Sequence, residues 1–213
     1  MGRFFVTKIY LIRHGESIAN TLGIYQGQTY DTVLSPLGKR QVRTLQTYFA
    51  GKSIGAIYTS PLTRTRKTAR HIALATGIPV QIDRHLLETN HGDWEGLPKA
   101  EIQLRWGDLL DAWNKDPQGV EFPGGETFVA LQTRVLTWFR QQLLLKKDTV
   151  FVTHDNVIRV IIAYLKGIPF WDFPLDPAGV TIVEVNGKDA RLVKLNDNRH
   201  LQDCLTNLKL HAL

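Results

Sequence analysis

Short apolar runs alternate along this chain with segments in which apolar residues recur at helical spacing. The runs at residues 9–12, 56–59 and 149–153 are rich in Ile, Val, Tyr, Phe and Thr, and we interpret them as buried strands. Alternation of strands and helices is typical of a sheet covered by helices on both faces. The pattern therefore predicts a three-layer α/β/α sandwich with a mostly parallel central sheet. No repeat or long linker divides the chain, so we expect one domain over residues 1–213.

Two Ser-Pro pairs and one long periodic segment predict helices. Ser35-Pro36 and Ser60-Pro61 each place a capping hydroxyl before a proline suited to a first helical turn. Between residues 126 and 143 the apolar residues fall on one helical face, which predicts a helix facing the core. They are Phe128, Leu131, Val135, Trp138 and Phe139.

The last quarter of the chain predicts a hairpin and an apolar tail. Residues 180–185 and 191–195 read as two strands, with Asn186-Gly187 in the turn between them. Residues 201–213 are apolar at intervals, and we expect them to pack on the body of the protein or on a second subunit.

Each of the three predicted buried strands runs directly into polar residues. Arg13 and His14 follow the first strand, Ser60 and the nearby Arg64 follow the second, and His154 follows the third. Ligands collect beyond the carboxyl ends of parallel strands. The three polar clusters therefore predict one shared site.

Composition narrows the classes of function. The chain is 43% hydrophobic and has one cysteine, Cys204, which excludes an internal disulfide and suits a reducing cytoplasm. No apolar run approaches the roughly 20 residues of a membrane span, so we expect a soluble cytoplasmic protein. A net charge of +6 favours anionic partners. The basic residues look scattered rather than striped, and no stacking or zinc-finger pattern appears, which argues against nucleic acid.

Phosphoryl transfer without a metal needs a nucleophile, fixed cationic donors and an acid for the leaving oxygen. His14 follows a strand, where its imidazole can reach a ligand, and Arg13 beside it offers a forked guanidinium. Arg64 lies in a predicted first helical turn, and His154 follows another strand. Glu88 ends the apolar approach His85-Leu86-Leu87, where desolvation favours the protonated acid. No histidine has metal-ligand spacing, so we expect no metal and no cofactor.

Several motifs, in order along the chain, resemble the histidine phosphatase superfamily, also called the phosphoglycerate mutase-like family. Arg13-His14-Gly15-Glu16-Ser17 followed by Asn20 is similar to its R-H-G-E-S/T-x-x-N signature. Further similar stretches, from about Ile9 to Ile161, are Tyr25-Gln26-Gly27, Ser60-Pro61-Leu62-Thr63-Arg64, Leu87-Glu88, Gly92-Asp93-Trp94-Glu95-Gly96, Gly124-Gly125-Glu126-Thr127 and Val152-Thr153-His154.

The resemblance implies a phosphohistidine formed on His14. Arg13, Arg64 and His154 would hold the phosphoryl oxygens and Glu88 would protonate the departing oxygen. The resemblance also implies that Asn20, Gln26 and Gly27 contribute to the substrate pocket.

Asp155 departs from the small or neutral residue that the family commonly carries after its second histidine. A carboxylate in an anion site would oppose binding. Asp155 is a candidate substrate-site residue whose side chain we expect to point away, capping a helix from Asn156 or contacting a basic neighbour.

The stretch from Glu88 to Trp94 resembles the metal-independent phosphoserine phosphatases, as do residues 120–126 and 195–201. We expect His91 to contact the substrate beyond its phosphate. The leading hypothesis is a phosphoserine phosphatase of serine biosynthesis that acts as a homodimer on a small phosphorylated metabolite. Alternatives are a phosphatase of α-ribazole phosphate, a sugar phosphate or many esters, a phosphoglycerate mutase, or a non-catalytic phosphate-binding module.

Overall fold

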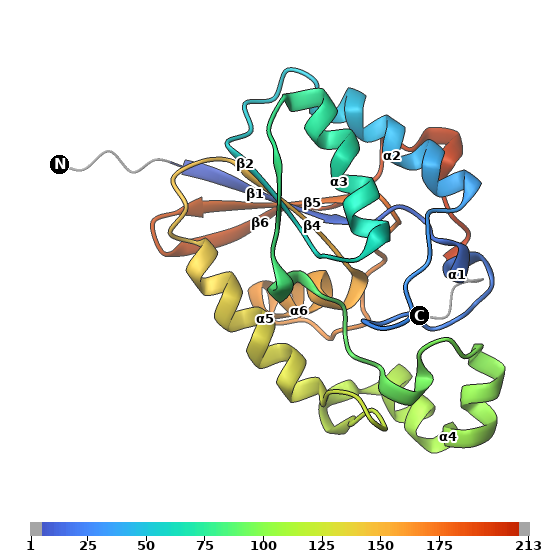
Figure 1. The fold of residues 1–213 in the computed structure, drawn as a ribbon. Coiled ribbons are helices and arrows are strands. Elements are labelled where there is room, and N and C mark those ends of the chain that lie inside the picture. Colours follow the sequence, from blue (N-terminus) through green and yellow to red (C-terminus); the bar gives the residue numbers. More distant parts are fainter. Residues whose placement is uncertain (1–5, 209–213) are drawn as a thin grey trace.

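The computed structural model describes residues 6–208, and its centre is a mixed six-stranded sheet with strand order β3-β2-β4-β1-β5-β6 (Figure 1). β1 pairs in parallel with β4, β4 with β2 and β2 with β3, whereas β5 pairs antiparallel with both β1 and β6. The mostly parallel sheet is therefore confirmed. The strands are β1 (Val6–Arg13), β2 (Ala56–Thr59), β3 (Val80–Ile82), β4 (Thr149–Thr153), β5 (Val180–Asn186) and β6 (Asp189–Asp197).

Helices cover both faces of the sheet, as the alternating pattern predicts. α2 (Pro36–Phe49) and α3 (Thr63–Thr76) lie on one face, and α5 (Phe128–Gln142) and α6 (Asp155–Lys166) lie on the other (Figure 1). Shorter elements and one peripheral helix complete the chain. They are α1 (Ile18–Thr21), η1 (Arg84–Leu86), η2 (Gly92–Trp94), α4 (Lys99–Lys115), η3 (Pro117–Gly119) and η4 (Gln202–Cys204).

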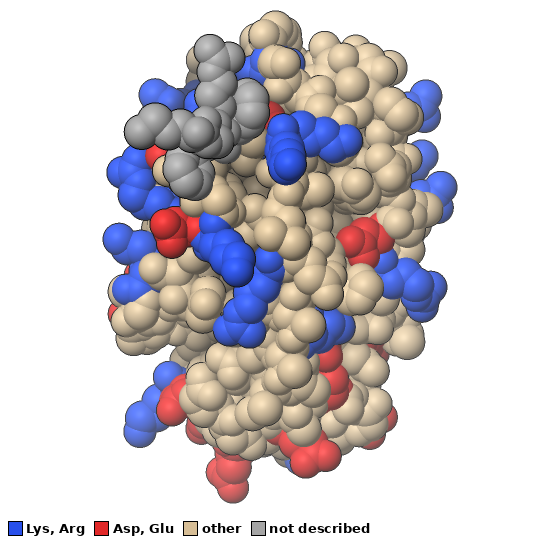
Figure 2. All heavy atoms as spheres, turned by 90° about the vertical axis from the view of Figure 1, so that its left-hand side faces the viewer, with Lys and Arg blue, Asp and Glu red and all other residues tan. Residues whose placement is uncertain are grey.

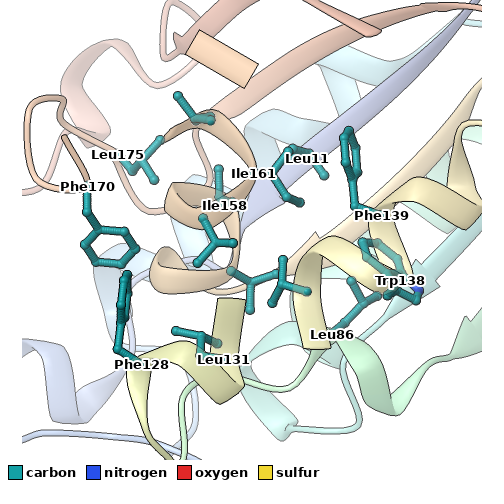
Figure 3. Packing of buried hydrophobic residues seen from close by; sticks show 14 of the residues in the cluster. Leu11, Leu86, Phe128, Leu131, Trp138, Phe139, Ile158, Ile161, Phe170 and Leu175 are labelled. Atoms are coloured by element: carbon teal, nitrogen blue, oxygen red, sulfur yellow. The ribbon is translucent and has the colours of Figure 1, made fainter. Parts of the chain in front are cut away.

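The core is divided by the sheet into two clusters because successive strand residues point to opposite faces. In β1, Ile9 and Leu11 join the cluster under α5 and α6, whereas Tyr10 and Ile12 join the cluster under α2 and α3. Figure 3 shows the first cluster, in which Leu11 meets side chains of α5 and α6. Strand β1 is thus held from both sides, which fixes the position of the residues at its end.

The expected helix starts have different outcomes. Ser35 caps α2 through a hydrogen bond from the Gly38 amide to its hydroxyl, with Pro36 in the first turn. Ser60 does not cap a helix, because α3 begins at Thr63 with Leu62 at the cap position. The helix expected at 126–143 is α5, which begins after its cap, Thr127.

The predicted hairpin forms, with its turn one residue later than expected. β5 extends through Asn186, which pairs with Asp189, so the loop is Gly187-Lys188. Gly187 has a φ of 65°, a conformation that favours glycine. Part of the expected apolar tail packs on the body: Leu201 is buried, and the Gln41 side-chain amide donates to the Cys204 carbonyl. Residues 209–213 of that tail lie outside the described residues.

Among residues 6–208, no helix is both long and apolar enough to cross a bilayer.

Candidate active site

The polar clusters at the ends of β1, β2 and β4 meet at one edge of the sheet, because these three strands are neighbours. The amide of His14 donates to the Thr153 carbonyl, and the amide of Ser60 donates to the Val152 carbonyl. These bonds bring the segments after all three strands together. A narrow pocket opens there, lined by Arg13, His14, Asn20, Ile24, Tyr25, Gln26, Arg64, Glu88 and Asp155.

His14 is held in one ring orientation by its own loop. Its Nδ1 lies 2.8 Å from the Gly15 carbonyl oxygen, which only accepts, so Nδ1 carries the proton. In the neutral ring the basic nitrogen is then Nε2. The His14 amide donates to the Thr153 carbonyl, and the Gly15 amide donates to the Thr68 hydroxyl. These two bonds fix the backbone at His14 and at the residue after it.

Arg13 is paired with Asp155, which contributes to the lining of the pocket. Asp155 Oδ1 lies 3.1 Å from Arg13 Nη1, and Asp155 Oδ2 accepts from Arg159 Nε. Arg13 Nη1 also donates to the Leu175 carbonyl at 2.6 Å. The expectation that Asp155 points away from the site is wrong. The expected contact with a basic neighbour is present, because the carboxylate sits between two guanidinium groups.

Arg64 is held by a similar pair. Its Nη1 lies 2.9 Å from Asp31 Oδ1, and its Nη2 donates to the Gly27 carbonyl at 3.0 Å. Gly27 contacts Arg64 through its backbone and is not among the lining residues. A Cβ at Gly27 would lie 2.8 Å from the Thr89 carbonyl oxygen, so a larger residue there would force the backbone to shift. Burial lowers the pKa of both Arg13 and Arg64 and the paired aspartates oppose this effect.

Glu88 is a buried carboxyl inside this group of charges. Burial, with a smaller contribution from the charge of Asp155, raises its pKa to about 7, while the bond from the Thr89 amide and the two arginines oppose the rise. Arg134 from α5 donates to the carbonyls of Leu87 and Glu88 and to the Glu126 carboxylate. These bonds fix the turn that carries Glu88.

His154 is fully buried and lies behind the lining residues, beside His14. The two rings meet edge to face with centroids 5.3 Å apart. His154 Nε2 lies 2.9 Å from the Ser60 hydroxyl. Burial, aided by the charge of Arg64, lowers the His154 pKa well below its usual value, so the ring is neutral at pH 7. The structure therefore places a neutral imidazole where the sequence predicts a phosphate ligand.

Asn20 and Gln26 line the pocket and are bound to Ser17. Asn20 Oδ1 accepts from the Ser17 amide and hydroxyl, and Gln26 Nε2 donates to the Ser17 hydroxyl. The Thr32 hydroxyl donates to Gln26 Oε1. This network fixes the loop that closes one side of the pocket.

His91 is not among the residues that line the pocket. It is fully buried between Tyr25, Trp113 and Phe122, and its Nδ1 lies 2.7 Å from the Gln26 carbonyl oxygen. Burial lowers its pKa to about 4, so the ring is neutral. The structure places His91 behind the pocket wall, where it supports the backbone of Gln26.

Asp31, Arg134 and Arg159 are the supporting residues that the sequence does not single out. Asp31 and Arg134 act on site residues far away in the chain, so only the fold brings them together, whereas Arg159 reaches Asp155 over four positions of the same helix. Asp31 follows no strand, and Arg134 and Arg159 sit in helices whose apolar spacing reads as ordinary core-facing sequence. No group of three or more His, Cys, Asp or Glu in residues 6–208 is arranged to hold a metal ion.

Comparison with known proteins places this geometry in a family. The model of the histidine phosphatase superfamily (branch 1) matches residues 9–198. Phosphoserine phosphatase 1 of Hydrogenobacter thermophilus is 31% identical over 201 residues, which cover 92% of this chain and 95% of that protein. Adenosylcobalamin/alpha-ribazole phosphatase of Escherichia coli is 32% identical, over 89% of this chain and 95% of that one. The solved structure of Bacillus stearothermophilus YhfR superposes with a TM-score of 0.86 at 29% identity, over 92% of this chain and 99% of that one.

Proposed function

The chain belongs to the histidine phosphatase superfamily (branch 1), and on that premise we propose that it hydrolyses phosphomonoesters through a phosphohistidine on His14. The observation that carries this proposal is the ring orientation of His14. With Nδ1 bound to the Gly15 carbonyl, Nε2 is the basic nitrogen of the neutral ring, and we assign to it the attack on phosphorus, in a pocket that also holds Arg13, Arg64 and Glu88.

In the first step, His14 Nε2 attacks phosphorus in line with the ester oxygen. The new N–P bond forms as the P–O ester bond breaks, and the Glu88 carboxyl gives its proton to the departing alkoxide. Arg13 and Arg64 balance the charge on the phosphoryl oxygens. Their guanidinium groups are already held by Asp155 and Asp31, so little reorganisation is needed when the substrate binds.

In the second step, a water molecule attacks the phosphohistidine. The Glu88 carboxylate formed in the first step takes a proton from that water, the N–P bond breaks, and inorganic phosphate leaves with His14 restored. The same carboxyl thus donates and then accepts a proton. A pKa near 7 suits both tasks at neutral pH.

For the substrate we propose phosphoserine, on the support of the 31% identity to phosphoserine phosphatase 1 and of the similarity at residues 88–94 and 195–201. The second candidate is α-ribazole phosphate, which the 32% identity to the Escherichia coli enzyme favours. The pocket is narrow, with a volume of about 20 Å³, so it has no room for more of the ester than its phosphoryl group, and the rest of the ester lies towards its mouth. Selectivity then depends on groups outside the phosphate pocket.

The test is kcat/KM for phosphate release from O-phospho-L-serine, α-ribazole 5′-phosphate, 3-phosphoglycerate and p-nitrophenyl phosphate. A preference for phosphoserine of about a hundredfold, equivalent to roughly 2.7 kcal/mol in the transition state, is the expected result. The same preference for α-ribazole phosphate would establish the second candidate. Equal rates on all four esters would exclude both specific assignments and leave a phosphatase of broad specificity.

A further inference from the structure

The positive charge of the chain is concentrated in one segment. Between Asp31 and Asp83 there is no acidic residue, whereas eight of the 26 Lys and Arg residues lie there. The rest of the chain therefore carries 18 basic residues against all 20 acidic ones. The basic residues are thus not scattered as the sequence pattern first indicates, because the whole net charge of +6 originates in this segment.

The fold gathers this segment on one surface, since α2 and α3 pack side by side on the same face of the sheet (Figure 1). Arg64 is buried in the pocket, and the other seven basic residues are exposed. They are Lys39, Arg40, Arg43, Lys52, Arg66, Lys67 and Arg70. None of the ion pairs formed within residues 6–208 involves any of these seven. In the view of Figure 2, by contrast, most acidic side chains lie in the lower half of the molecule.

A groove of about 460 Å³ runs between the two helices and combines this charge with apolar surface. We call it the α2–α3 groove; its lining is Val33, Leu34, Lys39, Val42, Lys67, Arg70, His71 and Leu74. Leu34 and Val42 are buried and form its floor, whereas Val33 and Leu74 are 52% and 62% exposed at its edges. Lys67, Arg70, His71 and Leu74 share one face of α3, because they are spaced three and four residues apart.

We propose that the α2–α3 groove is a docking surface for an acidic amphipathic segment of another protein. Carboxylates on a partner would complement the exposed cations, and apolar side chains between those carboxylates would cover the exposed Val33 and Leu74. An amphipathic helix laid along two parallel walls meets both requirements. A nucleic-acid backbone offers no apolar groups for Val33 and Leu74, and a flat bilayer does not enter a concave floor.

His71 contributes a ring without charge to the lining of the groove. Burial, together with the charges of Arg43 and Arg70, lowers its pKa, so the ring is neutral at pH 7. Its Nδ1 is buried and, within the described part of the chain, has no hydrogen-bond partner. The surface is separate from the phosphate pocket, since no residue lines both.

The test uses fluorescence anisotropy with a labelled peptide of about 20 residues, built from Glu and Leu with Leu at helical spacing. A Glu and Ser peptide of equal charge and an oligonucleotide of about 20 nucleotides are compared at roughly 0.15 M salt. The variant Lys67→Gln/Arg70→Gln removes two groove cations. The matched control Lys146→Gln/Lys147→Gln removes two exposed cations outside the groove, and Leu74→Ser removes the apolar edge.

The proposal predicts that the Glu and Leu peptide binds best, that the groove variant weakens it by about tenfold or more, and that the control stays within about twofold. Leu74→Ser should weaken the same peptide by about threefold. Equal losses in the groove and control variants would overturn the proposal, as would tighter binding of the oligonucleotide or no difference between the two peptides. Phosphatase activity should stay unchanged in all three variants, which separates this result from misfolding and from the proposed function.

Discussion

Replacing Glu88 with Gln should greatly slow turnover and at the same time stabilise the protein at alkaline pH. The amide keeps the size of the side chain and can still accept from the Thr89 amide, but it never carries the charge that burial opposes. The buried carboxyl has a pKa of about 7 in the fold against an ordinary value of 4.5. Because the pKa of the Glu88 carboxyl is raised in the fold, the stability that this carboxyl contributes is complete below its ordinary pKa of 4.5. That stability is lost as the pH rises through about 7.

The size of the effect follows from those two values. Each unit of pKa corresponds to about 1.4 kcal/mol. Relative to a side chain that does not ionise, Glu88 therefore lowers the free energy of unfolding by about 3 kcal/mol at pH 8.5 and by less than about 1 kcal/mol at pH 5. In a chain of this length about 3 kcal/mol raises Tm by roughly 6–12 °C. The variant should therefore melt well above the wild type at pH 8.5 and close to it at pH 5.

The assay is thermal unfolding of both proteins at the two pH values, with phosphatase activity measured on the same samples. Glu121→Gln is the matched control, because Glu121 is exposed. Its Tm difference from the wild type should be the same at both pH values. A Glu88→Gln difference that does not grow between pH 5 and pH 8.5 would refute the claim that this carboxyl is held at a raised pKa by burial.

Three further predictions concern the pocket. Because Glu88 must be protonated for the first step, kcat/KM should fall about tenfold per pH unit above its pKa of about 7. The variant Asp155→Asn removes a charge that raises this pKa, so the fall in kcat/KM should begin at a lower pH. A pH profile that does not move in this variant would contradict the role given to Asp155. Asp31→Asn leaves Arg64 without its carboxylate partner and should raise KM by about tenfold with a smaller change in kcat. A fall in kcat as large as the rise in KM would instead point to damage of the fold. Dialysis against EDTA should leave kcat unchanged, and activity restored only by an added divalent ion would show that a metal takes part.

The sequence predicts well those features that depend on neighbouring residues. Arg13 and His14 are placed by the end of β1, and the apolar run before them identifies that strand. The Ser35 cap is a local bond over three residues, and the periodicity of α5 appears directly in the order of its apolar positions. Features of this kind are readable because their physical cause lies within one element.

Long-range pairing accounts for most of what the sequence does not predict. Asp155 contacts Arg13 across the β1–β4 pair, and Asp31 reaches Arg64 from a separate loop. His91 looks like a substrate ligand because it lies near Glu88 in the chain, yet the fold surrounds it with aromatic rings. Ser60 resembles a helix cap, but its hydroxyl instead contacts His154.

The central claim, a phosphoryl group carried on His14, is tested most directly by trapping it. The Glu88→Gln variant should react with p-nitrophenyl phosphate, because p-nitrophenolate leaves without help from a general acid. The phosphohistidine that forms should then be hydrolysed slowly, because no general base takes a proton from the attacking water. The account predicts a burst of about one equivalent of p-nitrophenol and a base-stable, acid-labile phosphate on the tryptic peptide that begins at His14. Turnover with no covalent phosphate, or phosphate on any other residue, would contradict it.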